Sequence, residues 1–591
     1  MKLVFKNHIY NHIEEILAGL LGAAIFLWLY GPMVLDPSYV DYLKCGGDLS
    51  QHYYGWELYR QSDFQMLIGM SNGLAYPYST SVIFTDSIPL FAVIFKMFCH
   101  NVTGQFQYFG LWGLMCFVLQ GAIAAKLIKR RMKVDGITGK IITISLSVLF
   151  ILCPFFVRRM FWHSALAGQF IILLAIDIYD KSLNYNRMQL LERWLLMGML
   201  CASVHLYFLA MVGSVLMASC IYRFIVDCRL LKNHMIDRIL DAFVPVAGFT
   251  FFAWYVIFAL GGFNSNMDGG APGLGYYSFN LNGLFNADDG YSRVLSQLPL
   301  YEGGQYEGNA YLGLGMIILL VIAIIGWMLS KIVWLCRYHA RQEREEAVTG
   351  KVIDSEKITS SAYAVATVVM VVFVILLAAS NKVTFGDKLI VEIPISGIVE
   401  KIYSPFRSSG RLIWPVAYIL MLWTISELSN IYNNTRNISS AKIILSAVAI
   451  IGVVIQIYDI SGKLGDIHLS FKEEKIYHNF IYDDNEIVAK LIDDLSIKEG
   501  EKRHIVFLNK GALSQEELYA FTDIAIKNNM TINDFYFARN FPNNGKDIAI
   551  SYVLDGRKDC LYVFKMDELE DYSGLPFMMY TVGDLVCAVS Q

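Results

Sequence analysis

Charged residues are scarce in this sequence. Asp, Glu, Lys and Arg make up 17% of its 591 residues, whereas soluble domains carry about 25%. Apolar residues take their place, and 55% of the chain is hydrophobic. Many of the apolar runs reach the roughly 20 residues that a helix needs to cross the hydrocarbon core of a bilayer. The composition therefore excludes an ordinary soluble protein and predicts an α-helical polytopic membrane protein.

Further absences narrow the class. The ten cysteines contain no Cys-x-x-Cys pair and lie mostly inside apolar runs, so neither a zinc site nor a disulfide framework is expected. The net charge of −4 argues against a nucleic-acid partner. No small-residue cleavage site follows the first apolar run, which favours an uncleaved anchor over a signal peptide. No internal repeat is evident, and this weakens the case for an inverted-repeat transporter.

Apolar segments of spanning length recur over the first 460 residues. They lie at about 16–35, 105–127, 138–157, 162–179, 190–205, 207–226, 240–261, 310–334, 361–380, 411–429 and 441–460. Basic residues cluster in the loops at 126–133, 187–193, 223–232 and 337–344. Because Lys and Arg favour the cytoplasmic side, we place the N-terminus and these loops there. This arrangement predicts about eleven transmembrane helices.

A shorter segment, Ile88 to Phe98, decides between eleven and twelve crossings. It contains Pro89 near its start and carries Lys96, which favours an interfacial or re-entrant helix. If it crosses instead, the count is twelve and the basic loop 126–133 moves to the outside.

With eleven crossings, three long loops face outward, at 36–104, 262–309 and 381–410. The middle loop is rich in Gly and Tyr, which predicts an ordered, turn-rich segment rather than a helix. These loops would form the extracytoplasmic face of the protein.

The character of the chain changes near residue 465, where charge becomes dense. We therefore divide the chain into a polytopic membrane domain, 1–464, and a small soluble α/β domain, 465–591, on the outer side. RHIVFLNK (503–510) and KDIAISYVLDGRKDCLYVFK (546–565) predict strands, with a hairpin turn at Asp555 and Gly556. SQEELYAFTDIAIKNN (514–529) predicts a helix capped by Ser514, with Glu517 three residues later.

Asp48 is the first candidate for chemistry. It lies in GGDLSQHYYGWELYR (46–60), directly after the first span, together with His52. A carboxylate at the membrane surface can take the proton of an acceptor hydroxyl or hold a divalent metal. The alternative is that Asp48 caps a helix beginning at Ser50.

Asp86 lies later in the same outer loop, in AYPYSTSVIFTDSIPLF. Its position three residues before Pro89, in Asp-Ser-Ile-Pro, suits a helix start, so capping is the local alternative. Because both acids belong to one loop, the fold could bring Asp86 and Asp48 together. Two adjacent carboxylates would bind a cation or raise one pKa.

Two histidines follow at the outer ends of other spans. His163 comes shortly after Arg158 and Arg159 in VRRMFWHSALAGQ, and His205 lies in CASVHLYFLA. Ionisable groups in such places usually face a cavity. The alternative is that each imidazole only bonds a neighbouring carbonyl.

Arginines supply what a lipid phosphate would need. Arg407 and Arg411 flank two serines and a glycine in YSPFRSSGRLIWP (403–415). A guanidinium pairs with phosphate oxygens through its planar fork, and the alternative is a pair that anchors the span at the headgroups. YEGGQYEGNAYLGLG (301–315) adds Glu302 and Glu307 among aromatic residues, a composition suited to sugar binding or to interface anchoring.

Several stretches together resemble a largely uncharacterised family of bacterial multi-span proteins that is grouped with GT-C glycosyltransferases. They are GGDLSQHYYGWELYR, TSVIFTDSIPL, QYFGLWGLMCFVLQG, WHSALAGQF, GYYSFNLNGLF, GQYEGNAYLGLG and FRSSGRLIWPV. The resemblance covers most of residues 40 to 420. It implies a GT-C-like fold and an inverting transfer from a polyprenyl-phosphate-linked sugar, with a catalytic Asp in the first outer loop. Asp48 matches that Asp by position, with Asp86 as second acid and Arg407 as holder of the donor phosphate.

We therefore expect a membrane glycosyltransferase of the bacterial cell membrane that acts on an extracytoplasmic glycan or protein acceptor, with its C-terminal domain outside. Asp48 would be the base and Asp86 its support. Substrate binding would fall to His52, Arg159, His163, His205, Glu307, Arg407 and Arg411. A divalent metal, Mg²⁺ or Mn²⁺, stays open, with the two aspartates as ligands, because the first outer loop has no Asp-x-Asp pair. The alternatives are a lipid or polysaccharide transporter and a non-catalytic envelope-assembly scaffold.

Overall fold

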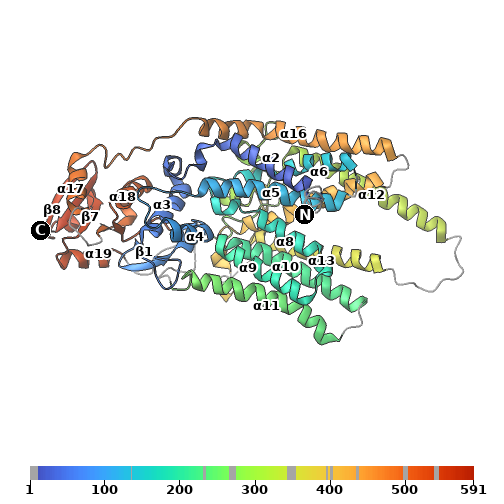
Figure 1. Cartoon of the computed structure of the whole chain (residues 1–591), viewed down its shortest axis with the longest axis horizontal. Coiled ribbons are helices and arrows are strands. Elements are labelled where there is room, and N and C mark those ends of the chain that lie inside the picture. The colour runs from blue at the N-terminus through green and yellow to red at the C-terminus, as the bar shows by residue number, and fades with distance from the viewer. Residues whose placement is uncertain are drawn as a thin grey trace, which may run out of the picture.

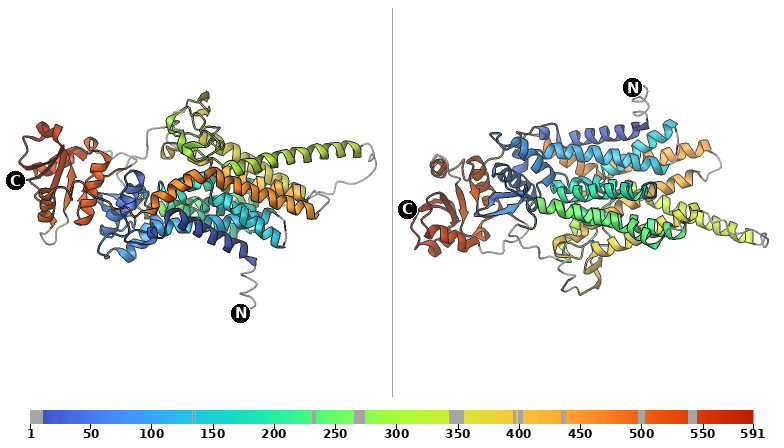
Figure 2. Two further views of the ribbon diagram at one scale, coloured as in Figure 1. Left: turned by 90° about the horizontal axis from the view of Figure 1, so that it is seen from above. Right: turned by 60° about the horizontal axis from the view of Figure 1, so that its bottom comes forward.

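A bundle of long helices forms one part of the molecule, and a five-stranded sheet with its helices forms the other (Figure 1). The computed structural model describes residues 11–132, 134, 136–230, 234–264, 274–342, 355–394, 397–398, 403–433, 438–496, 503–537 and 545–590. The two parts meet at one end of the bundle, and the C-terminus lies at the far tip of the sheet domain (Figure 2).

In the described part of the chain, eight helices are long and apolar enough to cross a membrane. They are α2 (Ile13–Tyr30), α5 (Phe109–Met132), α10 (Tyr207–Arg229), α11 (Met235–Ala259), α12 (Leu314–Gln342), α13 (Ser355–Ala379), α15 (Trp414–Asn433) and α16 (Ile438–Lys472). The chain is thus a multi-pass membrane protein with a small C-terminal sheet region, as the sequence predicts. The division expected at residue 465 falls inside α16.

Three of the expected spans correspond to helices that are too short or too charged to be counted among these eight. α6 (Gly136–Ile151) and α8 (Phe170–Asp180) have too few residues, and α6 is followed by the four-residue α7 (Pro154–Val157). α9 (Arg187–Val204) has 18 residues but contains three charged side chains. The short segment near Pro89 forms α4 (Pro89–Cys99) with 11 residues. The number of crossings therefore stays a prediction.

Small residues let the first two long helices approach closely. A Cβ atom added at Gly22 of α2 would lie 2.2 Å from the carbonyl oxygen of Phe117 in α5, and one at Gly121 would lie 2.4 Å from that of Ala18. Without a hydrophobic driving force between helices in lipid, such close backbone packing is a main source of association. α2 and α5 thus form a tight pair at this side of the bundle.

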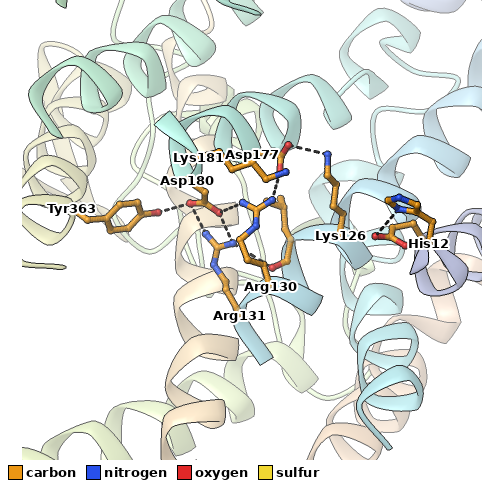
Figure 3. A network of polar contacts seen from close by, with 10 residues as sticks. His12, Lys126, Arg130, Arg131, Asp177, Asp180, Lys181 and Tyr363 are labelled. Carbon is orange, nitrogen blue, oxygen red and sulfur yellow. Dashed lines mark hydrogen bonds and ion pairs between the residues drawn. The ribbon is translucent and has the colours of Figure 1, made fainter. Parts of the chain in front are cut away.

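Charged side chains gather where α5 and α8 end (Figure 3). Lys126 donates to Asp177 at 2.9 Å, and Arg131 pairs with Asp180 at 2.7 Å. The hydroxyl of Tyr363 near the start of α13 also donates to Asp180, at 2.7 Å. This network includes Lys126, Arg130 and Arg131 of the basic cluster predicted at 126–133, of which residue 133 lies outside the described residues. Because α5 has 24 residues, it separates this end from the other by roughly 36 Å at 1.5 Å per residue.

The opposite end of the bundle is built largely from the first long loop. It contains α3 (Gly47–Gln61), the antiparallel strands β1 (Met70–Ala75) and β2 (Tyr78–Ser81), and α4. Every residue of α3 from Leu49 to Arg60 is buried. Short 3-10 helices complete this end, at Met33–Leu35, Asp41–Lys44, Val82–Thr85, Ser164–Ala167, Asp288–Gly290, Gly303–Gly308, Ser404–Phe406 and Ser409–Ile413. A further 3-10 helix, Ser182–Asn184, follows α8 at the charged end. β3 (Lys382–Phe385) and β4 (Lys388–Glu392) form a second hairpin.

The C-terminal domain has a sheet of order β6-β5-β7-β9-β8. Its strands are β5 (His504–Phe507), β6 (Thr531–Ile532), β7 (Cys560–Lys565), β8 (Phe577–Val582) and β9 (Leu585–Ser590), with helices α17 (Glu486–Ser496), α18 (Gln515–Lys527), α19 (Gly545–Leu554) and α20 (Leu569–Tyr572) and 3-10 helices at Lys510–Ala512 and Met566–Glu568. β5 pairs parallel with β6 and β7, whereas β9 pairs antiparallel with β7 and β8. The domain is α/β in class, as predicted.

The predicted helix after Ser514 is confirmed, including its cap. The hydroxyl of Ser514 accepts the N–H of Glu517 at 3.2 Å, and the carboxylate of Glu517 accepts the N–H of Ser514 at 2.8 Å. The predicted hairpin at Asp555 is wrong, because the residues before it form α19 and only those after it form a strand, β7. Ala549 and Val553 are both buried, four residues apart, so one helical face packs on the sheet.

Candidate functional site

A cavity of about 580 Å³ lies at the end of the bundle where the C-terminal domain docks. Its charged and hydrogen-bonding lining residues are Asp48, Gln51, Asp86, His163, His205, Tyr207, Arg407, Ser408, Arg411 and Tyr536. Its apolar lining residues are Ile83, Phe84, Pro89, Ala202, Val204, Leu206, Leu209, Ile257, Pro405, Phe406 and Phe537. The volume is within the range of small-molecule sites, about 300–1,000 Å³. Six of the nine residues predicted for the site, both aspartates included, line this cavity.

Asp48 lies in the first turn of α3 and does not cap it. The helix begins at Gly47, and its N-cap, Gly46, makes no side-chain cap hydrogen bond. The capping alternative, a helix that begins at Ser50, is therefore wrong. Ser50 instead accepts the N–H of Gly46 at 2.8 Å and donates to the carbonyl of Leu43 at 2.9 Å. This leaves the carboxylate of Asp48 free to face the cavity, where the positive helix N-terminus favours its charge.

Asp86 also has a role other than capping. The N-cap of α4 is Ile88, which has no side-chain cap hydrogen bond, and Asp86 itself ends the preceding 3-10 helix with a φ of 53°. Left-handed backbone is uncommon outside glycine, although Asp tolerates it better than most residues. Oδ1 of Asp86 lies 3.3 Å from Nε2 of His205. The turn therefore aims Asp86 at the imidazole.

Each aspartate faces one histidine through the same ring nitrogen. Nε2 of His163 lies 2.9 Å from Oδ2 of Asp48. Arg159 approaches Nδ1 of this ring at 3.4 Å and Arg411 approaches Nε2 at 3.2 Å. Two guanidinium groups disfavour a cationic imidazole, and the shorter contact, with Asp48, assigns the one ring proton to Nε2. The approach of Arg411 to Nε2 is then not a hydrogen bond, because both groups are donors. Arg159 then donates to Nδ1.

The second pair has an equivalent arrangement. The backbone N–H of Tyr207 donates to Nδ1 of His205 at 3.2 Å. Nδ1 is thus an acceptor, and Nε2 carries the proton that faces Asp86. In both pairs, a donor fixes the imidazole so that its N–H points at the carboxylate.

Electrostatics keep both carboxyl groups ionised. Burial alone would raise the pKa of Asp48, but the hydrogen bond from His163 outweighs burial and lowers that pKa below its ordinary value. The same balance holds at Asp86, where His205 lowers the pKa against burial. Burial, together with the charge of Arg411, lowers the pKa of His163. The site therefore holds carboxylate anions at neutral pH.

His52 lies behind the cavity wall on α3. It is 0% exposed, and its ring centre is 6.5 Å from that of His163. Burial lowers the pKa of His52 to about 4, although Asp86 and Asp48 act to raise it. Neither ring nitrogen has a hydrogen-bond partner among the described residues. The predicted contact of His52 with a substrate is therefore not direct in this arrangement.

Glu307 holds two arginines rather than lining the cavity. Its Oε2 accepts from Nη1 of Arg159 at 2.8 Å and from Nε of Arg411 at 2.7 Å. Its backbone carbonyl accepts a third bond from Arg159, at 3.0 Å. All three side chains are buried. Charges buried in this way need full pairing, so this triad is a rigid support for the ring of His163.

Arg407 differs from Arg411 in what it binds. It lines the cavity and is half-buried, with its guanidinium 5.0 Å from the ring centre of Tyr277. Within the described ranges, no carboxylate pairs with Arg407. Of the two arginines predicted to hold a phosphate, Arg407 has its donors available, whereas Arg411 is largely committed to Glu307.

The sequence prediction missed the part of the wall that comes from the C-terminal domain. Tyr536 and Phe537 follow β6 and line the cavity opposite residues of the first loop. Gln51 and Tyr207 were missed as well. Gln51 follows Asp48 by just under one helical turn, and Tyr207 follows His205 in the chain, so local spacing could have found both. No local signal links Tyr536 to Asp48.

A divalent metal does not fit this arrangement well. Among the residues that the structure describes, no group of three or more His, Cys, Asp or Glu side chains is placed to hold a metal ion. One oxygen of each aspartate already faces an imidazole N–H, which occupies it. No reaction step is therefore assigned to a metal.

Comparisons with known proteins identify two matching segments. A family model described as a domain of unknown function (DUF6311) matches residues 19–461, and one described as the DUF6311 C-terminal domain matches residues 496–588. The first match covers more than half of the chain. A comparison with curated proteins found no match.

Solved structures of an archaeal enzyme share a distant likeness. The Archaeoglobus fulgidus oligosaccharyltransferase tethered with an acceptor peptide containing the NVT sequon is 13% identical, with a TM-score of 0.39, over 95% of this chain and 70% of that one. Its complex with Zn and sulfate is 12% identical, with a TM-score of 0.36, over 94% and 68%. Likeness at this level carries no argument about the reaction, which is argued below from the cavity.

Proposed function

The chain belongs to the DUF6311 family, and we propose that it is a membrane glycosyltransferase. It would move a sugar from a polyprenyl-phosphate-linked donor to a hydroxyl acceptor outside the cytoplasm. The observation that carries the proposal is the pairing of Asp48 with His163 and of Asp86 with His205 on the wall of one cavity.

Asp48 has the geometry of the group that handles the acceptor. One of its oxygens accepts from His163, and its side chain is 33% exposed to the cavity. As the acceptor oxygen attacks the anomeric carbon, the bond from that carbon to the phosphate oxygen breaks, and its electron pair leaves with the phosphate. The acceptor proton passes to Asp48. Because the pKa of Asp48 is low, the carboxylate is a weak base. It takes the proton only after the acceptor oxygen has begun to bond to the anomeric carbon and has gained positive charge.

Asp86 would stabilise charge rather than move a proton. Sugar transfer passes through a transition state with positive charge on the ring. A fixed carboxylate in a partly buried site favours that charge and needs no reorganisation as the reaction proceeds. The N–H of His205 holds Asp86 in one orientation throughout.

Arg407 would receive the phosphate of the donor. Its guanidinium is placed at the cavity wall without a carboxylate partner among the described residues, and an arginine fork pairs with phosphate oxygens in a bidentate way. Apolar side chains of α10 and α11, Leu209 and Ile257, line another part of the same cavity. A substrate with a charged head and an apolar tail suits such a lining.

The proposed location is the bacterial cell membrane, with the cavity and the C-terminal domain on the outer side. The basic cluster around Lys126 lies at the opposite end of α5 from the cavity. Positive residues favour the cytoplasmic side, which supports an outward-facing cavity. The acceptor would then be a glycan or protein of the cell envelope.

The experiment that tests this proposal uses the purified full chain in liposomes. Polyprenyl-phosphate-linked hexoses and pentoses with a radiolabelled sugar are supplied as donors, and an envelope glycan and protein extract as acceptor. We expect label to move from the organic-soluble lipid into the acceptor fraction. Movement of the intact labelled lipid across the bilayer without covalent transfer would instead support a transporter. If neither sugar transfer nor lipid movement is detected, the remaining alternative is a non-catalytic scaffold in envelope assembly.

A further inference from the structure

The segment that carries Asp48 is held by the C-terminal domain. The hydroxyl of Tyr519 in α18 donates to the backbone carbonyl of Gly47 at 2.9 Å. Asp523, one helical turn later, pairs with Lys44 at 2.8 Å. These two contacts bracket Cys45 and Gly46 and end directly before Asp48. They join residues that lie more than 470 positions apart in the chain.

This segment has little to fix it locally. Gly46 and Gly47 have φ values of 89° and 63°, and a Cβ atom added at either would meet nothing within 4 Å. Glycine reaches positive φ without steric cost and has more backbone freedom than any other residue. Gly46, the N-cap, has no side chain to cap the helix. The local contacts come from the hydroxyl of Ser50, which accepts the N–H of Gly46 and donates to the carbonyl of Leu43. The direction in which α3 starts, and with it the place of Asp48, must therefore be set partly by contacts from elsewhere.

The ion pair between Asp523 and Lys44 is buried and can therefore select one docked position of the C-terminal domain. The side chain of Lys44 is 3% exposed and that of Asp523 is 0% exposed. Asp523 also pairs with Lys527 at 3.0 Å, and Asn479 donates to it at 3.4 Å. A buried pair contributes little net stability, but breaking it leaves an uncompensated charge. Such a pair favours one docked position of the domain over others.

Aromatic contacts continue this interface into the cavity. The ring of Tyr519 lies 5.4 Å from that of Tyr54 on α3, and 6.2 Å from that of Tyr536. Tyr536 in turn lines the cavity. One run of side chains thus joins α18, the start of α3 and the cavity wall.

We propose that Tyr519 and Asp523 are positioning residues for Asp48, so that the C-terminal domain is a working part of the catalytic unit. This inference rests on the proposed function for its activity readout. The structural part of the inference, that Tyr519 and Asp523 hold the start of α3, does not depend on the proposed function. Loosening the contact would lower turnover while leaving the donor-binding side of the cavity, at Arg407, as it is.

The test compares two Tyr→Phe substitutions in the full chain. Tyr519→Phe removes the hydroxyl that holds Gly47 and keeps the ring. Tyr482→Phe is the matched control, because its hydroxyl donates to Asp493 in an exposed contact and its ring is kept. Cys45 supplies a structural readout, since it is exposed two residues before Gly47. Cys228 is exposed at the other end of the bundle and serves as the internal reference.

We expect Tyr519→Phe to lower the turnover number about 2- to 10-fold, the range that one hydrogen bond supplies, with the KM for the lipid donor unchanged. Cys45 should react with a maleimide several-fold faster relative to Cys228, and Tyr482→Phe should change neither value. Equal Cys45 reactivity in wild type and both variants would overturn the inference, whatever the activity. If wild type transfers no sugar but Cys45 still responds, the proposed function fails and the positioning role stands.

Discussion

Nε2 of His163 lies 2.9 Å from Oδ2 of Asp48, and the N–H of His163 donates a hydrogen bond to that oxygen. The ring is held in this orientation from behind by Arg159, which Glu307 fixes in turn. This chain of contacts makes Asp48 an ionised, oriented carboxylate at the cavity wall. It also links three elements of the fold that are distant in sequence.

The first prediction concerns pH. The hydrogen bond from His163 lowers the pKa of Asp48, and Asp48 acts as the anion, so activity is lost as pH falls through that pKa. His163→Ala removes the bond while burial remains, so the pKa of Asp48 rises. The acidic limb of the pH profile of transfer should therefore move to higher pH.

The matched control for this change is His478→Ala. His478 pairs with Asp483 and Asp484 and is 62% exposed in the linker before the C-terminal domain. Its profile should overlay that of wild type. An unmoved acidic limb in His163→Ala would mean that this histidine does not set the ionisation of the group that limits the rate.

The second prediction separates the two arginines. Arg407→Gln should keep the thermal stability of wild type and raise the KM for the lipid donor about tenfold or more, because one charge-assisted contact is worth about 1.5–3 kcal/mol. Arg411→Gln should lower stability by about 1–3 kcal/mol, since it removes one of the two partners of buried Glu307. Thermal unfolding in nanodiscs and donor titrations measure both effects. Similar behaviour of the two variants would contradict the assignment.

The third prediction fixes sidedness with native cysteines. Cys45 is exposed, two residues before Gly47 at the start of α3. Cys228 is exposed near the end of α10, next to Arg229. In intact cells, a membrane-impermeant maleimide should label wild type and Cys228→Ser equally, and Cys45→Ser much less. Loss of labelling in Cys228→Ser instead would place the cavity in the cytoplasm.

The fourth prediction concerns helix packing. Gly22→Ala adds a Cβ atom at 2.2 Å from the carbonyl oxygen of Phe117, so α2 and α5 must move apart, and the thermal stability of the protein should fall. Gly465→Ala in α16 is the control, because a Cβ atom there meets nothing within 4 Å. Ala is favoured over Gly in a helix by about 1 kcal/mol, so this variant should be as stable as wild type or more so. Equal unfolding temperatures for both variants would refute the close packing.

Local chemistry allowed much of the fold and site to be predicted. Polar residues next to apolar runs are costly in a membrane, and for this reason Asp48 and His163 stood out in the sequence. Their pairing could not be predicted, because it depends on how the first loop folds back over the bundle. α19 was taken for a strand because short apolar runs suit both structures. Tyr519 and Tyr536 were beyond reach, since only the docking of the domain brings them to α3.

The most direct test of the account is the rate of sugar transfer in proteoliposomes by Asp48→Asn beside Asp36→Asn. Asp36 lies in the same loop, 36–104, is exposed, and accepts hydrogen bonds from the N–H and the hydroxyl of Ser38. We predict that Asp48→Asn lowers the rate at least 100-fold, as expected when a group that takes a proton in the transition state is lost, whereas Asp36→Asn transfers at the wild-type rate. Equal rates for Asp48→Asn and wild type would contradict the account.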